Sequence, residues 1–171
     1  MKTLIAYFSS AGQNYVNGAI TNISKGNNEV LAEKLKKMLP EADLFKIEPK
    51  KTYSNDYMTC IEEAKQDLHQ NARPELKSYL DNIDEYDKIY LIYPIYWGTF
   101  PMHVFTFLEK YDFSGKTIIP ISTHEGSGLG SSESDLRKLV KNAKIGKGTA
   151  ITGGRVNSAD GILENLIKQG E

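Results

Sequence analysis

The sequence predicts an α/β fold of three layers, a doubly wound, five-stranded parallel sheet with helices on both faces. Two observations predict it: apolar runs of strand length alternate with amphipathic helical segments, and the loops of unusual composition all follow strands. Such alternation gives parallel strands joined by right-handed crossovers. The chain has 171 residues, of which 40% are hydrophobic and 25% charged, so we expect one domain over residues 1–171.

The first half of the chain supplies two strands and two helices. Residues 2–8 form an unbroken apolar run, typical of a strand buried on both faces, whereas residues 42–48 alternate apolar and charged side chains, typical of an outer strand. Asn27 or Asn28 can cap the first helix, and Pro40 marks its end. Residues 56–71 follow as a polar helix with an apolar stripe formed by Tyr57, Ile61, Ala64 and Leu68.

The second half supplies three strands and three helices. Residues 86–93 are a second buried strand, and Pro101 suits the first turn of the helix that follows. The next strand is predicted over residues 116–121, where Pro120 is awkward for a central position. Ser132 with Asp135 resembles a capping box for a helix to residue 141. A short strand over residues 148–152 and a helix over residues 159–168 complete the alternation.

A polar insertion, residues 15–25, separates the first strand from the first helix and carries a turn signal at Asn17-Gly18. A helix N-terminus offers unpaired N–H donors and a dipole that favours anions. We therefore expect Asn27 and Asn28 to fold back beside Ser9, at the end of the first strand.

Charge and cysteine content limit the function. The formal net charge of −1 gives no global field for nucleic acid or an anionic membrane, and no apolar run approaches the roughly 18 residues that a membrane span needs. The single cysteine, Cys60, cannot form an internal disulfide and supplies no metal cluster. We expect Cys60 to pack a helix, no metal site, and a reducing, cytoplasmic location.

Three loops follow strands, and in a parallel sheet they converge at the carboxyl ends, where ligands bind. Residues 9–14 offer neutral hydroxyl and amide donors, typical of an anion cradle, although a plain strand-to-helix turn is the alternative. Residues 94–101 display two aromatic side chains between two prolines, and residues 122–132 contain three alternating glycines. Neutral phosphate donors beside aromatic surface predict a mononucleotide site. The phosphate-loop and dinucleotide fingerprints of nucleotide-binding proteins are absent.

At these loops the chain resembles the flavodoxin superfamily, in particular its short FMN-binding branch with an insertion in the phosphate loop. The motifs that carry the resemblance are Tyr7-Phe8-Ser9 with Gly12, Gly26-Asn27, Tyr93-Pro94-Ile95-Tyr96-Trp97-Gly98, Asp112-Phe113-Ser114-Gly115-Lys116, and Thr123-His124 with Gly126-Ser127-Gly128. The resemblance covers nearly the whole chain. It implies a flavodoxin-like sheet of order 2-1-3-4-5 and FMN bound without a covalent link.

The same resemblance implies the cofactor-binding residues. They are Ser9, Ala11, Gly12, Gln13, Asn14, Asn27 and Asn28 for the phosphate, and Pro94, Ile95, Tyr96, Trp97, Gly98, Thr123, His124, Glu125, Gly126 and Gly128 for the ring. Ala11 and Asn28 stand where the family usually has Thr, so we expect weaker FMN binding. His124 is a candidate to hydrogen-bond the ring or deliver a proton, with a structural role as the alternative. No catalytic side chain is predicted.

The expected function is therefore that of an FMN-binding redox protein, either an NAD(P)H-dependent reductase of a small molecule such as a quinone or an electron-transfer flavoprotein. Electron carriers of this type are strongly acidic, so the net charge of −1 favours the reductase. A flavin-free binding module that keeps the fold is the alternative, and a phosphoacceptor signalling domain is disfavoured because the acidic cluster it needs is missing. The resemblance also suggests a homodimer.

Overall fold

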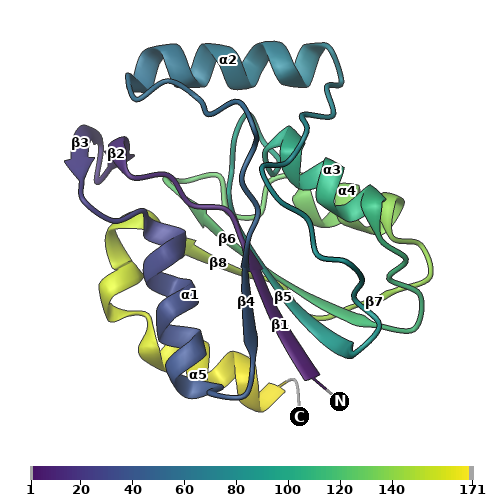
Figure 1. Ribbon diagram of the computed structural model, residues 1–171. Coiled ribbons are helices and arrows are strands. Elements are labelled where there is room, and N and C mark those ends of the chain that lie inside the picture. Colours follow the sequence, from purple (N-terminus) through teal and green to yellow (C-terminus); the bar gives the residue numbers. More distant parts are fainter. Residues whose placement is uncertain (1, 170–171) are drawn as a thin grey trace.

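The computed structural model describes residues 2–169 and has a central parallel sheet (Figure 1). Its strands are β1 (Lys2–Tyr7), β4 (Asp43–Lys46), β5 (Tyr86–Pro94), β6 (Thr117–His124), β7 (Lys144–Ile145) and β8 (Thr149–Thr152). They run in the order β4-β1-β5-β6-β7, with β8 also paired to β6, and all pairs are parallel. Because β7 and β8 together occupy the place of the fifth strand, the predicted order is confirmed.

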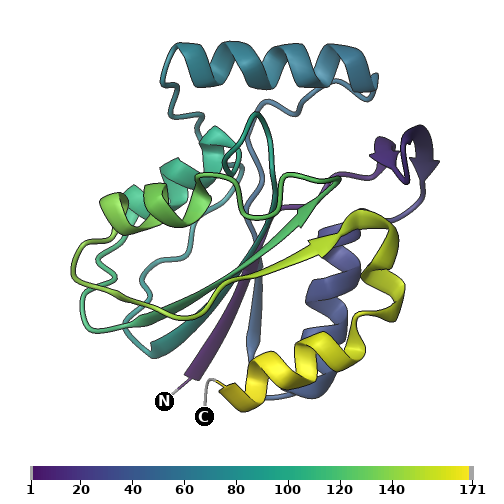
Figure 2. The ribbon, with the colours of Figure 1, turned by 180° about the vertical axis from the view of Figure 1, so that it is seen from behind.

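Helices cover both faces of this sheet. They are α1 (Asn27–Met38), α3 (Met102–Lys110), α4 (Ser132–Leu139) and α5 (Asp160–Gln169), the last preceded by a 3-10 turn, η1 (Gly153–Ser158). Helices α1 and α5 lie on one face and α3 and α4 on the other (Figures 1 and 2). Each face has its own apolar core, one containing Leu31 and Leu163, the other Val104 and Leu136. The expected three layers are therefore present.

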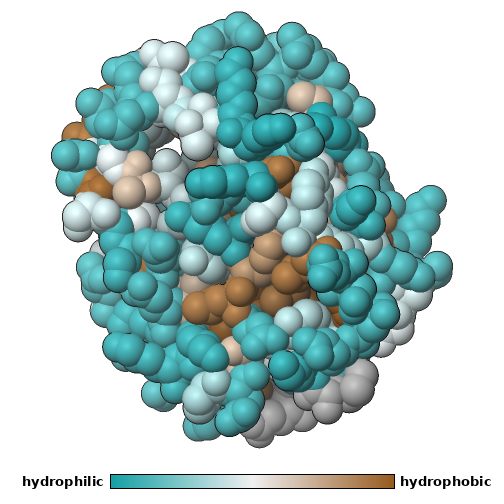
Figure 3. All heavy atoms as spheres, in the orientation of Figure 1, coloured by the Kyte–Doolittle hydropathy of each residue, from teal (hydrophilic) through white to brown (hydrophobic). Residues whose placement is uncertain are grey.

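Helix α2 (Tyr57–His69) departs from the layered arrangement, because it lies across the carboxyl end of the sheet instead of on a face (Figure 1). Ala64 is its one buried residue, and hydrophilic side chains cover its outward surface (Figure 3). It contacts α3 and the strand β2 described below. Helix α2 therefore forms a roof over the edge of the sheet where the unusual loops end.

The insertion folds as an antiparallel hairpin of β2 (Gly12–Val16) and β3 (Ala19–Ile23), separate from the main sheet. The predicted turn at Asn17-Gly18 is confirmed: their φ values of 52° and 82° are those of a turn that matches the twist of paired strands. The strands themselves were not predicted because their few apolar side chains, such as Tyr15 and Ile20, are exposed. The hairpin also shortens the predicted phosphate loop to Ser9–Ala11.

Two predicted helix caps are wrong. Gly26 is the N-cap of α1, and Asn27 and Asn28 are the first residues of the helix. Helix α4 begins after Ser131, and the Ser132 hydroxyl instead contacts the buried Tyr93 hydroxyl at 2.8 Å. In both cases tertiary contacts take the side chain that the local sequence offers for capping.

Strand β6 ends three residues later than predicted, at His124, because β8 pairs with residues 121–124. Pro120 lies where the partner of β6 changes from β7 to β8. Since proline cannot donate a ladder hydrogen bond, this interruption explains how a central strand contains it.

Within residues 2–169 there is no helix of the length and apolarity that crossing a membrane requires.

Candidate functional site

A cavity of about 340 Å³ lies at the carboxyl ends of the strands, under α2. The predicted site residues that line it are Ser9, Gln13, Asn14, Asn27, Asn28, Pro94, Ile95, Tyr96, Trp97, Thr123, His124 and Glu125. The other lining residues are Ser10, Tyr15, Tyr57, Cys60, Ile61, Ala64, Ser127 and Gly153. The predicted residues Ala11, Gly12, Gly98, Gly126 and Gly128 are not among them. The fold thus brings all three predicted loops to one cavity.

At one end of the cavity the N-terminus of α1 meets the end of β1. The Ser9 hydroxyl, with Ser9 only 8% exposed, accepts the Glu29 N–H at 3.0 Å. A Cβ on Gly26 would overlap the Ser9 hydroxyl and stand 2.9 Å from the backbone N of Ser10, so this approach requires glycine. The helix therefore presents its first turn, with the N–H groups of Asn27 and Asn28 and its positive dipole end, to the cavity.

The side chain of Asn28 holds this junction together. Its Nδ2 donates to the Phe8 carbonyl at 2.9 Å, and Asn28 is buried. Its Oδ1 is also buried and has no hydrogen-bond partner among the described residues. The Asn28 side chain therefore ties α1 to the residue that follows β1, and one of the two N–H groups of its amide remains for a ligand.

The amides of the hairpin are oriented by their neighbours. Asn14 Nδ2 donates to the Ser10 carbonyl at 3.0 Å, which braces the shortened loop. Gln13 Oε1 accepts the Tyr57 N–H at 2.9 Å, so its Nε2 is the atom left to donate to a ligand. The Ser10 hydroxyl donates to the Ala11 carbonyl at 3.3 Å, whereas the Ser9 hydroxyl accepts the Glu29 N–H and keeps its own hydrogen. The neutral side-chain donors that line this end are consequently Ser9 Oγ, Gln13 Nε2 and Asn27 Nδ2.

Gly12 has a different task from the predicted one. It has φ of 86°, and a Cβ there would overlap the side chain of Asn55 in the connection that precedes α2. The positive φ favours glycine here, whereas the Asn55 side chain could move away from a Cβ. Gly12 therefore lets the hairpin pack against the connection to α2 instead of cradling an anion.

The aromatic wall of the cavity is a tight turn at the end of β5. The Tyr96 N–H donates to the Thr99 carbonyl at 2.7 Å, and the two residues between, Trp97 and Gly98, have φ of 55° and 90°. A left-handed φ is uncommon for a tryptophan, which is 48% exposed here. The Trp97 indole N–H donates to the Ile61 carbonyl of α2 at 2.7 Å, and Lys65 Nζ lies 5.3 Å from the ring centroid. These contacts hold the strained turn against the roof.

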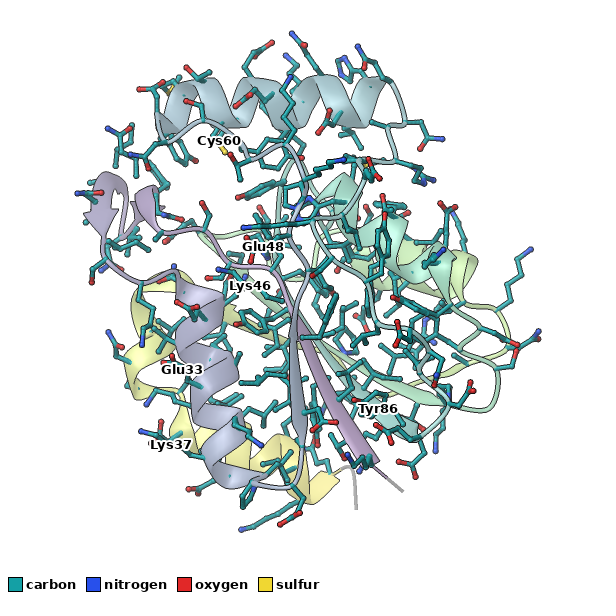
Figure 4. All side chains as sticks on the ribbon, in the orientation of Figure 1. Glu33, Lys37, Lys46, Glu48, Cys60 and Tyr86 are labelled. Atoms are coloured by element: carbon teal, nitrogen blue, oxygen red, sulfur yellow. The ribbon has the colours of Figure 1, made fainter. Side chains whose placement is uncertain are left out.

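Cys60 lies on the side of α2 that faces the sheet (Figure 4) and lines the cavity, where packing alone was expected. Its thiol hydrogen-bonds with the Tyr96 hydroxyl. Burial, and secondarily the Glu63 carboxylate, raises the pKa of Cys60 to about 11, so the thiol is protonated at neutral pH. Burial likewise raises the pKa of Tyr96. This part of the wall is therefore uncharged.

The third wall follows β6. The Thr123 carbonyl accepts the Ile95 N–H at 3.1 Å, which joins this wall to the aromatic turn. His124 Nδ1 accepts the Gly126 N–H at 2.8 Å, and Gly126 has φ of 134°. The Gly128 carbonyl accepts the Ser122 hydroxyl at 2.9 Å. Gly126 and Gly128 thus shape the loop behind the cavity without lining it.

Electrostatically, the cavity carries one carboxylate and no lysine or arginine among its lining residues. Glu125 Oε1 accepts the Asn17 N–H of the hairpin turn at 3.3 Å. Asn27 Nδ2 and Glu125 Oε1 would stand 2.8 Å and 3.0 Å from a Cβ on Gly153, so the carboxylate is a neighbour of the N-terminus of α1. Within residues 2–169, His, Cys, Asp and Glu form no group of three or more suited to a metal ion.

The roof residues Tyr57, Cys60, Ile61 and Ala64, and Gly153 after β8, are lining residues that the sequence did not assign to the site. The apolar stripe of the second predicted helix contains three of them, but an apolar stripe alone does not tell whether it faces a core or a ligand. Gly153 follows the last strand, so the rule that placed the other three loops at this edge could have included it.

Comparison with known proteins agrees with this architecture. Residues 2–165 match the sequence profile of the family described as flavodoxin. A solved structure from Bacteroides uniformis, assigned as a flavoprotein, is 28% identical, covers 98% of this chain and 97% of its own, and has a TM-score of 0.76. A Lactobacillus acidophilus flavoprotein, described as a complex with FMN, is 19% identical over 92% of this chain and 97% of its own, with a TM-score of 0.64. Oxidised flavodoxin 2 of Bacillus cereus is 18% identical over 99% of both chains, with a TM-score of 0.55.

The last two similarities show the shared fold. No curated protein matches the chain. The family profile spans nearly all of the sequence, from the start of β1 into α5, and therefore includes every wall of the cavity. On this match the chain belongs to the flavodoxin family.

Proposed function

We propose that this protein binds FMN without a covalent link in the cavity under α2 and uses it in a redox reaction. The observation that carries the proposal is that the two ends of one cavity differ in chemistry. One end has neutral hydrogen-bond donors at the N-terminus of α1, and the other has the aromatic turn of Tyr96 and Trp97. A phosphate suits the first end and a flat ring system suits the second. The family relatives described as FMN complexes support the assignment.

In this proposal the phosphate is held by the Ser9 hydroxyl, Gln13, Asn27 and the first backbone N–H groups of α1. The ring lies against residues 94–97 and 123–125, with α2 as the roof. Bound FMN supplies the transfer of one or two electrons. The chain's own residues bind it, exclude water from it and orient it, and none is assigned as catalytic.

We further propose that the reaction is NAD(P)H-dependent reduction of a small molecule such as a quinone, in the cytoplasm and by a homodimer. The net charge of −1 supports a reductase, since docking of a carrier on a basic partner favours an acidic surface. A cavity of about 340 Å³ is at the lower end of ligand pockets, which span about 300–1,000 Å³. It is sized for one ligand.

The test is a titration of the purified protein with FMN and, separately, with riboflavin, followed by visible absorption. We expect a shifted flavin spectrum with FMN and weaker binding of riboflavin, which lacks the phosphate. NAD(P)H oxidation by the FMN-loaded protein, measured with and without a quinone, then separates a reductase from an electron carrier. Failure to bind FMN would overturn the proposal and leave a flavin-free binding module.

A further inference from the structure

His124 lines the cavity, and the proton position of its ring is set by a neighbouring backbone group. The Gly126 N–H donates to His124 Nδ1 at 2.8 Å, and a backbone N–H can only donate. Nδ1 is therefore the acceptor nitrogen, and a neutral ring carries its proton on Nε2. Nε2 has no hydrogen-bond partner among the described residues. The nitrogen that remains for a ligand is thus a donor.

The placement of this donor is built into the backbone. His124 is the last residue of β6 and pairs with Thr152 of β8, while the Thr123 carbonyl before it accepts the Ile95 N–H. Gly126 has φ of 134°, a conformation that side-chain-bearing residues rarely adopt, so the turn that aims its N–H at Nδ1 depends on glycine. The imidazole is held by two strands and by its own turn before any ligand arrives.

From this arrangement, and given the FMN site proposed above, we infer that His124 Nε2–H is a hydrogen-bond donor that raises the reduction potential of the bound flavin. Reduction of FMN by two electrons and one proton, all supplied from outside the protein, leaves one negative charge on the ring. A hydrogen bond to a charged group is stronger than one to a neutral group. The donor therefore stabilises the reduced ring more than the oxidised ring.

The competing explanation is that His124 serves only to hold the loop of residues 125–128 through its Nδ1. Two substitutions separate the two roles. In His124→Asn the amide oxygen can replace Nδ1 as the acceptor for Gly126, but the Nε2 donor is lost. In His124→Gln the amide nitrogen can replace the Nε2 donor, but the acceptor near Gly126 is lost. His69→Asn, at the exposed end of α2, is the matched control.

The first measurement uses the protein without FMN. Long-range ¹H–¹⁵N NMR of the imidazole should show the Nε2–H tautomer for His124. A ring protonated on Nδ1 would overturn the inference and would leave the proposed FMN site untouched.

The second measurement is the two-electron midpoint potential of the FMN-loaded wild type and variants by dithionite titration. In His124→Asn the preference for oxidised over reduced FMN should increase about tenfold, which lowers the potential by about 30 mV. His124→Gln and His69→Asn should stay within about threefold of wild type. An unchanged potential in His124→Asn, or equal shifts in Asn and Gln, would overturn the inference. Failure of the wild type to bind FMN would instead overturn the proposed function.

Discussion

The indole N–H of Trp97 donates to the carbonyl of Ile61 at 2.7 Å, and this bond joins the aromatic turn after β5 to the roof helix α2. Helix α2 buries only Ala64, so its position depends on a few polar and aromatic contacts and not on a large apolar face. Further attachments include the Gln13 contact to the Tyr57 N–H and the stacking of Tyr15 on Tyr57, with ring centroids 6.0 Å apart. The Tyr53 hydroxyl also donates to the Asp67 carboxylate at 2.7 Å.

Trp97→Phe should therefore loosen α2, because it keeps an aromatic ring and removes the donor. One hydrogen bond of about 1 kcal/mol corresponds to about fivefold less protection of the α2 amides from hydrogen exchange. Lys65→Met, which removes the cation beside the ring and keeps the indole N–H, is the control and should change protection less. Unchanged exchange in Trp97→Phe would show that the bond does not hold the roof.

Gly26→Ala should abolish or strongly weaken FMN binding. The new Cβ would overlap the Ser9 hydroxyl and stand 2.9 Å from the backbone N of Ser10, so the N-terminus of α1 must move away from the loop. Gly161→Ala, in α5, adds the same methyl group where no atom lies within 4 Å. Equal FMN affinity in the two variants, measured by fluorescence titration, would contradict the placement of the phosphate at this junction.

Glu125→Gln should tighten the binding of FMN severalfold at low salt. The change removes a negative charge beside the phosphate donors but keeps an oxygen for the Asn17 N–H. The gain should shrink at high ionic strength and should be absent for riboflavin, which carries no phosphate charge. Glu164→Gln, an equal charge change on the exposed side of α5, should have no effect. A gain with both ligands would show that the carboxylate acts on the ring instead.

His103 should make the protein sensitive to acid. It is fully buried, its two ring nitrogens have no partner among the described residues, and burial lowers its pKa from 6.5 to about 3. Between these values the unfolded chain binds the proton and the folded chain does not, so stability falls as pH falls, by up to about 1.4 kcal/mol per pH unit.

Urea unfolding between pH 6.5 and 4 measures this slope. His103→Leu should flatten it, because the leucine at this position cannot titrate. His69→Leu should leave the slope as in wild type, because His69 is exposed. Equal slopes in His103→Leu and wild type would assign the acid sensitivity in this pH range to other groups.

The order of the strands and the convergence of the three loops could be predicted, because hydrophobic periodicity and the rules of parallel sheets act over whole elements. The caps could not be. Ser9 caps α1 from 20 residues away, and Ser132 is drawn to Tyr93, a residue 39 positions earlier in the chain. Such contacts exist only after the sheet has formed, so no local sequence pattern predicts them.

The candidate site likewise contains residues whose position could be predicted from the sequence and residues whose position could not. Tyr96, Trp97 and His124 follow directly from their positions at strand ends, and all three line the cavity. Gly12 was expected to meet a ligand but does not line the cavity, whereas Asn28 lines it and also bonds to the Phe8 carbonyl. Small and amide side chains can contact a ligand or the protein backbone equally well. Only their orientation in the folded protein decides which of the two they contact.

The hairpin begins and ends at neighbouring points, because Gly12 pairs with Ile23. The chain thus leaves the layered domain and returns to it almost where it left, and the sheet order does not depend on what lies between. The sheet and its helices therefore support the domain, whereas the hairpin, a separate stretch of sequence, helps to enclose the cavity. A shorter or longer hairpin, or one with other side chains at its face, could change what the cavity admits while the sheet remains as it is.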